Sequence, residues 1–214
     1  MPVRHLMSDE TAPRHLRRRD YAEMPWRNGG GVTFEIAREP QAGVDFDWRL
    51  SLALIERSGP FSSFTGYQRA IALVSGPGCI LHGIDTTAVS LSVPGDRALF
   101  SGSAAVECEL VAGPCHDLNL MVREPGRILA VKYLQLSACS AEPMIIAAAH
   151  NAVFCLDGVV ECVDNNSGRR ILLARHDTLL LPAPVAANWQ VQSRDAKAAA
   201  LTYAWQGLPA DENL

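Results

Sequence analysis

A short run of polar residues near the middle of the chain has the spacing of a strand with one polar face. Asp117, Asn119 and Met121 alternate with Leu118 and Leu120, so the two sets of side chains point to opposite faces of the strand. If the polar face lines a small barrel, its carboxyl and amide groups can bind a ligand or transfer a proton. If it is the outer face of a sandwich strand, the same groups are merely solvated. The pattern by itself favours the second interpretation.

The histidines and cysteines do not have the spacing of a metal site. The six histidines, at positions 5, 15, 82, 116, 150 and 176, include no His-x-His pair and no two that are four residues apart. A transition metal needs several imidazole, thiolate or carboxylate ligands brought together. The six cysteines form no Cys-x-x-Cys pair and lie in apolar strand-like runs, as small hydrophobic residues do. We therefore expect no metal, no cofactor and reduced thiols.

The overall charge argues against nucleic acid as a partner. Nineteen Lys and Arg against 23 Asp and Glu give 19 − 23 = −4, so the molecule as a whole does not attract polyanions. A basic run at 14–19 lacks interleaved aromatic residues, and we interpret it as a solvated arm. No apolar run is long enough to span a bilayer, and no secretory segment is recognised, so we expect no membrane contact and a cytoplasmic location.

Strand-like alternation dominates the chain and predicts an all-β fold. In the segment 46–54, apolar side chains fall on every second position, and 31–37 follows the same rule. Further short runs of this kind are separated by turn sequences such as Gly76-Pro77-Gly78 and Pro94-Gly95-Asp96. Many short strands with frequent turns indicate a sandwich or a barrel.

An internal repeat indicates that the barrel occurs twice. The segment 70–76 (AIALVSG) lies over 152–158 (AVFCLDG) at an offset of about 80 residues, and 95–100 lies over 176–181. Each copy has the order strand, glycine turn, strand, aspartate turn and strand. This order resembles that of the cupin double-stranded β-helix. We therefore predict a bicupin of two jelly-roll barrels in tandem. Its parts are a flexible arm (1–13), a first cupin unit with a ligand pocket (14–136), a second cupin unit (137–207) and a tail (208–214).

The ligand positions of metal-binding cupins hold other residues in both copies. The sequences of those proteins contain two motifs that resemble G-x5-H-x-H-x3,4-E-x6-G and G-x5-P-x-G-x2-H, and these motifs supply the metal ligands. Counting back from Gly76 places Arg69 at the carboxylate position, and Asn151 takes that position in the second copy. The guanidinium of Arg69 reverses the local charge, so a pocket of this shape would prefer an anion such as a carboxylate. In the same alignment, Asp117 and Asn119 lie over Ala199 and Leu201, so we expect the ligand in the first unit only.

Five segments in the right order resemble the HutD/Ves family. They are MPWRNGGGVTFEI (24–36), DWRLSLA (47–53), GPFSSF (59–64), GYQR (66–69) and DLNLM (117–121). The resemblance implies a bicupin without a bound metal. It also implies a link to histidine utilisation, with a small acid such as urocanate or formylglutamate as ligand, and no established reaction.

Three hypotheses for function follow from these residues. The first is a metal-free sensor or accessory protein, rather than an enzyme, that binds a small anionic metabolite. Its expected ligand-binding residues are Glu35, Arg49, Ser51, Ser62, Arg69, Asp117 and Asn119.

The second is a metal-free isomerase, lyase or hydrolase, with Glu35 or Asp117 as a buried general base. The third is a purely structural partner protein, and a homodimer is left open in every case. A buried polar pocket in the first unit would argue against the third, and a carboxyl group with a raised pKa in that pocket would favour the second.

Overall fold

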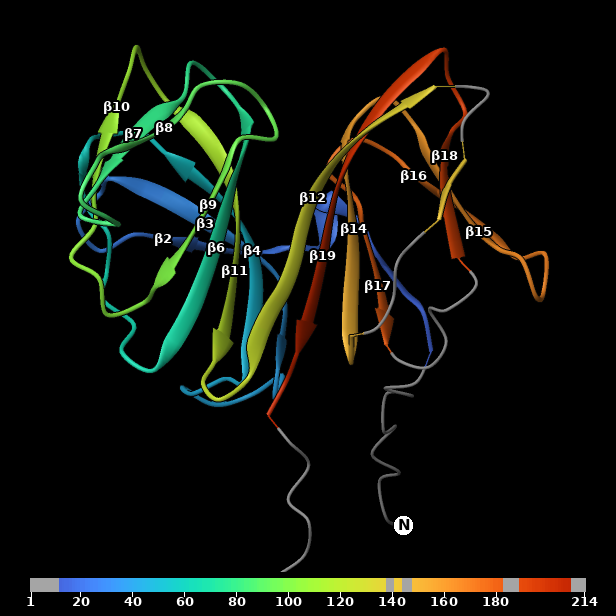
Figure 1. Ribbon diagram of the computed structural model, residues 1–214, viewed down its shortest axis with the longest axis horizontal. Helices are drawn as coiled ribbons and strands as arrows, with labels where there is room; N and C mark the ends of the chain where they lie inside the picture. Colours follow the sequence, from blue (N-terminus) through green and yellow to red (C-terminus); the bar gives the residue numbers. More distant parts are fainter. Residues whose placement is uncertain (1–11, 138–140, 144–147, 183–188, 209–214) are drawn as a thin grey trace, which may run out of the picture.

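A computed structural model describes residues 12–137, 141–143, 148–182 and 189–208 (Figure 1). The predicted flexible arm and tail lie almost entirely outside these residues. The described chain folds into four antiparallel sheets, two for each unit. The three-residue η1 (Arg18–Asp20) is the one helix in this part of the chain, and no helix there is long and apolar enough to cross a membrane.

The first unit places a six-stranded sheet against a four-stranded one. The six-stranded sheet has the order β2 (Ala22–Pro25), β3 (Gly31–Glu39), β4 (Trp48–Ile55), β11 (Cys115–Arg123), β6 (Tyr67–Ser75) and β9 (Arg97–Ser101). The four-stranded sheet has the order β5 (Gly59–Pro60), β10 (Glu107–Leu110), β7 (Cys79–His82) and β8 (Val89–Leu91).

The second unit repeats this arrangement. Its five-stranded sheet has the order β1 (Arg14–Leu16), β17 (Thr178–Pro182), β14 (His150–Asp157), β19 (Lys197–Gln206) and β12 (Arg127–Ser137). Its four-stranded sheet has the order β13 (Ala141–Pro143), β18 (Trp189–Ser193), β15 (Val160–Asp164) and β16 (Arg170–Leu173). The all-β prediction is confirmed.

Three hydrophobic clusters hold the sheets together. One fills the first unit, one fills the second, and the largest joins the two long sheets where the units meet in the middle of Figure 1. In the joining cluster, Leu118 of β11 and Tyr203 of β19 are both buried, and the Tyr203 hydroxyl donates a hydrogen bond of 3.1 Å to the Leu118 carbonyl. Central strands such as β11 and β19 therefore face a barrel on one side and the other unit on the opposite side.

Two strands from the segment predicted as the first unit (14–136), β1 and nearly all of β12, belong to the five-stranded sheet of the second unit. β1 pairs with β17, and β12 pairs with β19 along most of its length. The interpretation of the basic run as a solvated arm is wrong for its first residues. Arg14, His15 and Leu16 form a strand because their backbone completes the edge of β17, while Arg17 and Arg19 are exposed.

The strand register corrects the alignment of the two copies by one residue. Leu73, three residues before Gly76, pairs with Asp117, and Cys155, three residues before Gly158, pairs with Ala200. The counterpart of Asp117 is therefore Ala200, and by the same count that of Asn119 is Thr202. A shift of one residue reverses the face of a strand. The residues first aligned, Ala199 and Leu201, accordingly lie in the cluster between the units.

Candidate functional site

A cavity of about 400 Å³ lies in the first unit, on the barrel face of the six-stranded sheet. Six of the seven residues expected to bind a ligand line it: Arg49, Ser51, Ser62, Arg69, Asp117 and Asn119. The other lining residues are Met24, Pro25, Trp26, Arg27, Asn28, Thr33, Ala53, Pro60, Phe61, Phe64 and Met121. The strand 117–121 therefore turns its polar face into a cavity, and its solvent-face interpretation is wrong.

Strand pairing arranges the polar residues in rows across the sheet. Met121 on β11 pairs with Arg49 on β4 and with Arg69 on β6, which forms the first row. Asn119 lies beside Ser51 in the second row, and Asp117 lies in the third. At about 3.3 Å per residue, Asp117 is roughly 13 Å along the strand from Met121. The backbone positions of the arginines and of Asp117 therefore lie toward opposite ends of the cavity floor, although the long Arg69 side chain still interacts electrostatically with Asp117.

The two arginines are held by aromatic rings. The guanidinium carbon of Arg69 lies 5.0 Å from the centroid of the Phe100 ring and 5.7 Å from that of Phe64. That of Arg49 lies 4.8 Å from the Phe46 centroid and 5.4 Å from the same Phe64 ring. Such contacts orient a cation without neutralising its charge.

Both arginines also keep hydrogen-bonding capacity unused. Arg69 is only 6% exposed and donates a hydrogen bond of 3.3 Å from Nη1 to the Ser62 carbonyl. Within the described residues, the buried Nε groups of Arg49 and Arg69 have no hydrogen-bond partner, and neither side chain forms an ion pair. Burial lowers the pKa of Arg69 to about 10, so the group remains a cation at neutral pH. An unpaired donor in a buried position is costly, which favours an anionic partner there.

Asp117 is the acidic group of the cavity. It is 4% exposed, and burial raises its pKa to about 7, although the nearby Arg69 acts in the opposite direction. No hydrogen bond to its carboxyl group is found in the described part of the chain. The amide oxygen of its neighbour Asn119 is also buried without a partner. This end of the cavity therefore offers two acceptors at high pH, and a carboxyl O–H donor at low pH.

Two of the predicted ligand-binding residues, Ser62 and Glu35, contribute less to the cavity than expected. Ser62 is exposed at the mouth, and it is its backbone carbonyl that contacts Arg69. Glu35 does not line the cavity. It pairs with Ser51 on the neighbouring strand, at a position from which its charge favours the charged form of Arg49. Glu35 is therefore a neighbour of the site and not one of its walls.

The wall formed by residues 24–28 was not among the predicted ligand-binding residues, and the glycines that follow it at 29–31 form a turn. A turn is present: Gly29 has φ +66°, the Trp26 carbonyl accepts a hydrogen bond of 3.0 Å from the Gly29 N–H, and Asn28 Oδ1 accepts one of 3.0 Å from the Gly30 N–H. Gly31 lets this hairpin approach β4, because a Cβ there would lie 2.2 Å from the Leu54 carbonyl oxygen. The segment resembling the family, MPWRNGGG, was the available signal for the wall.

The side chains lining the cavity do not fit a divalent metal ion. They include one carboxyl group, no imidazole and no thiol, together with guanidinium groups that repel a cation. No cluster of three or more His, Cys, Asp or Glu suited to a metal ion occurs among the described residues. In the second unit, the positions of Arg69, Asp117 and Asn119 hold Asn151, Ala200 and Thr202, and apolar side chains fill the barrel.

Comparison with known sequences places the chain in a family. The HutD family model matches residues 18–200. A 21.2 kDa protein in the hutC 3′ region of Pseudomonas putida is 48% identical over 107 residues, which are 50% of this chain and 56% of that protein. Protein Ves of Citrobacter koseri is 39% identical over 108 residues, 49% of this chain and 56% of that protein. The chain thus spans about half the length of the curated relatives it matches.

Solved structures give the same result. A conserved protein of unknown function from Pseudomonas aeruginosa PAO1 has a TM-score of 0.80 at 30% identity, covering 91% of this chain and 99% of that one. HutD from Pseudomonas fluorescens SBW25, in a formate condition, has a TM-score of 0.72 at 29% identity, covering 92% and 100%.

Salicylate 1,2-dioxygenase from Pseudoaminobacter salicylatoxidans, in adducts with gentisate, has a TM-score of 0.63 at 10% identity, covering 91% and 81%. That similarity is one of fold alone, and it agrees with the predicted cupin architecture. Because the family model matches most of the chain, in a range that contains all five segments, this protein belongs to the HutD family.

Proposed function

We propose that this protein binds a small organic acid in the cavity of the first unit and acts as a sensor or accessory factor in histidine utilisation. The observation that carries the proposal is the pair Arg49 and Arg69, two cations in one cavity with unpartnered Nε groups. A carboxylate is the planar anion that matches a guanidinium group, and it would supply both the missing acceptor and the missing charge.

The charge of the cavity agrees with this ligand class. Arg49 and Arg69 contribute two positive charges, and Asp117 is only partly ionised at neutral pH because its pKa is about 7. The cavity therefore carries net positive charge under the conditions in which metabolic acids are fully ionised. Low surrounding polarity strengthens the attraction, since burial reduces screening by water.

The two ends of the cavity point to an acid with a second polar group. Arg49 and Arg69 would hold the carboxylate beside Met121, while Asp117 and the Asn119 amide face a group that donates or shares a hydrogen bond. Phe61 and Phe64 offer flat walls near the arginines. Urocanate and formylglutamate have this polarity, and the hutC 3′ location of a relative supports a ligand from histidine breakdown.

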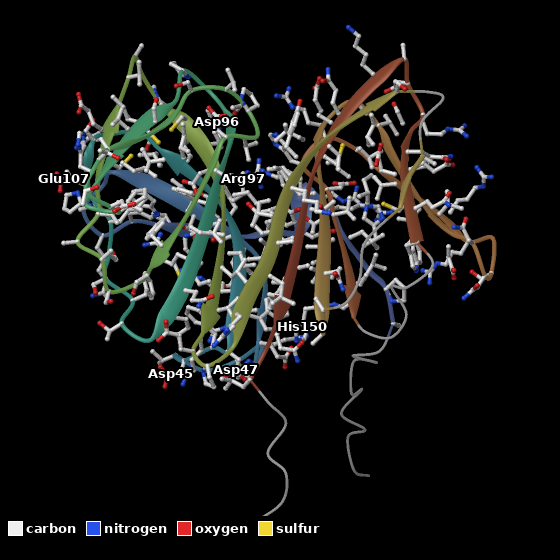
Figure 2. All side chains as sticks on the ribbon, viewed as in Figure 1. Asp45, Asp47, Asp96, Arg97, Glu107 and His150 are labelled. Carbon is white, nitrogen blue, oxygen red and sulfur yellow. The ribbon has the colours of Figure 1, made fainter. Side chains whose placement is uncertain are left out.

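Calorimetric titration of urocanate and formylglutamate into the wild type, Arg69→Met and Arg97→Met tests the proposal. Arg97 is an exposed arginine on β9, the strand beside β6, and it does not line the cavity (Figure 2). Arg69→Met should weaken binding by about 2–5 kcal/mol, because it removes a buried charged partner. Arg97→Met should change it by less than about 1 kcal/mol.

Equal affinities of the wild type and Arg69→Met would refute the role of this arginine. Binding of neither acid to the wild type would remove the histidine-pathway ligands. Circular dichroism of each variant shows whether the fold is retained, so that a loss of binding is not a loss of structure.

A second candidate function has one specific observation in its favour. Asp117, with a pKa of about 7, has the property of a general acid or base at neutral pH, and the arginines could stabilise an oxyanion. In this alternative the protein is a metal-free isomerase, lyase or hydrolase. Proton NMR of each acid incubated with the protein should then show product, and Asp117→Asn should abolish its formation while binding remains. A buried polar cavity speaks against a purely structural partner protein.

A further inference from the structure

The segment 14–28 connects the second unit to the cavity of the first. β1 pairs with β17, with Leu16 opposite Thr178, and β2 pairs with β3 after a crossing of only five residues, 17–21. Residues 24–28 then form one wall of the cavity. Each residue of this wall is therefore within about a dozen positions of a contact with the second unit.

Asp177 fastens the start of this segment. Its Oδ2 lies 3.0 Å from His15 Nε2, and its Oδ1 accepts a hydrogen bond of 3.0 Å from the Arg18 backbone N–H. Asp177 is 7% exposed, and both contacts are partly buried. Hydrogen bonds to a buried carboxylate are among the stronger ones in proteins.

Tyr21 fastens the end of the crossing. Its hydroxyl donates a hydrogen bond of 2.7 Å to the His176 carbonyl and lies 2.7 Å from Thr178 Oγ1. The ring is 8% exposed and belongs to the cluster that joins the units. His176 has φ +68°, a left-handed conformation that a non-glycine residue keeps only where its surroundings enforce it. The contact with Tyr21 therefore helps to hold the turn 174–177 in its conformation.

The wall is attached to the first unit mainly at its hairpin end. β2 is a four-residue edge strand whose side chains are mostly exposed, and it pairs with β3 alone. At the hairpin, Trp26 packs against the core cluster of the first unit and its Nε1 donates a hydrogen bond of 2.8 Å to Thr33 Oγ1 on β3, while the Gly30 carbonyl accepts hydrogen bonds from the N–H groups of residues 56 and 57. The opposite end of β2 follows directly after Tyr21. A short exposed edge strand opens readily unless its ends are held.

We propose that Asp177 and Tyr21 are positioning residues, which hold the 24–28 wall of the cavity by fastening residues 14–21 to the second unit. The second unit then contributes to ligand binding without a ligand of its own. This inference rests on the proposed function only where binding is concerned, because the fastening of the wall can be measured without any ligand.

Hydrogen exchange followed by mass spectrometry tests the fastening directly. The proteins are the wild type, Tyr21→Phe, Asp177→Asn and Ile171→Val. Ile171→Val trims the core cluster of the second unit, which includes no residue of the segment 14–21, and is the matched control. In the first two variants, amides of residues 22–33 should exchange about fivefold to tenfold faster, which is the loss of about one hydrogen bond. The strands β14 and β19 should exchange as in the wild type, and the control should leave residues 22–33 unchanged.

A second measurement links the wall to binding, with formate as the probe and chemical shifts as the readout. Tyr21→Phe and Asp177→Asn should weaken formate binding severalfold, and Ile171→Val should not. Unchanged exchange at 22–33 in both variants would overturn the inference, as would equal acceleration in the control. If exchange accelerates as expected but the wild type binds neither formate nor the larger acids, the proposed function fails and the positioning role stands.

Discussion

Arg49 on β4 and Arg69 on β6 both pair with Met121 on β11, so they lie on either side of the central strand of the cavity floor. Their guanidinium groups also approach one ring, that of Phe64, at 5.4 and 5.7 Å. The two guanidinium groups carry like charges and repel one another, and the charge of Arg49 contributes to the lowered pKa of Arg69. An anion between them would remove the repulsion, which is the physical basis of the acid binding proposed for this pair.

Replacement of Phe64 should weaken acid binding through both arginines at once. Phe64→Leu keeps an apolar side chain but removes the ring face, and each cation–π contact is worth about 0.5–2 kcal/mol. We expect roughly tenfold weaker binding of formate or urocanate. Tyr133→Leu is a control, because Tyr133 lies on β12 and does not line the cavity. Calorimetry that gives equal affinities for Phe64→Leu and the wild type would contradict this role.

Asp117 should make an unfavourable contribution to the stability of the protein that grows as pH rises from about 4 to about 7. Its pKa is raised by burial, so the folded state binds a proton that the unfolded state has released in this window. Asp117→Asn removes the titration and should exceed the wild type in stability at pH 8, by at most about 4 kcal/mol. At pH 4 the difference should be small. Urea unfolding of both proteins at the two pH values measures this, and a difference that does not change with pH would count against it.

Binding of formate should weaken above pH 7. Ionised Asp117 adds a negative charge to the cavity, which opposes a bound anion, and formate has no donor group at neutral pH that could compensate. The affinity should fall from pH 6 to pH 8 in the wild type and stay nearly constant in Asp117→Asn. A pH dependence that the variant retains would assign the effect to another group.

The two units can be compared by matched substitutions at equivalent positions. Asn119→Leu removes the unpartnered amide of the cavity, whereas Thr202→Val changes the corresponding position of the second unit. The first should weaken binding of urocanate or formylglutamate about tenfold, and the second should leave it unchanged. A crystal soaked with either acid should show density in the first unit, and density in the second barrel would reverse the assignment.

The purified protein should contain no stoichiometric transition metal. The reason is the donor set of the cavity, with a single carboxyl group beside two guanidinium groups. Elemental analysis of protein prepared without chelators measures the content. About one metal ion per chain, with loss of acid binding when it is removed, would end the metal-free interpretation.

Most of the fold was predictable because a half-buried strand has a strict period of two. The runs at 31–37 and 46–54 agree with the observed strands β3 and β4 to within two residues at each end. β1 was not predictable because three residues, Arg14, His15 and Leu16, are too few to show a period, and their partner strand lies far along the chain. β18, with the alternating sequence WQVQS, was overlooked although its pattern was present.

The polar floor of the cavity was predictable for a different reason. Asp117 and Asn119 share a face by alternation, and the cupin register pointed to Arg69. The walls could not be found in this way, because Trp26 and Phe64 lie in loops without a period. The one-residue error in aligning Ala199 with Asp117 arose because the second copy has one residue more between the paired strands: Leu73 and its partner Asp117 are 117 − 73 = 44 positions apart, whereas Cys155 and its partner Ala200 are 200 − 155 = 45 apart. A gapless comparison of the two copies does not contain this extra residue.

The pairing of His15 with Asp177 also sets the order of events during synthesis of the chain. The two residues are 162 positions apart, so the strand that begins the described fold must wait for its partner until most of the protein has left the ribosome. β12 likewise waits for β19. A fragment that ends near residue 136 would carry both strands unpaired and would expose their edges to other chains. The two units, although similar in architecture, are therefore inseparable as folding units, and the first unit expressed alone should aggregate.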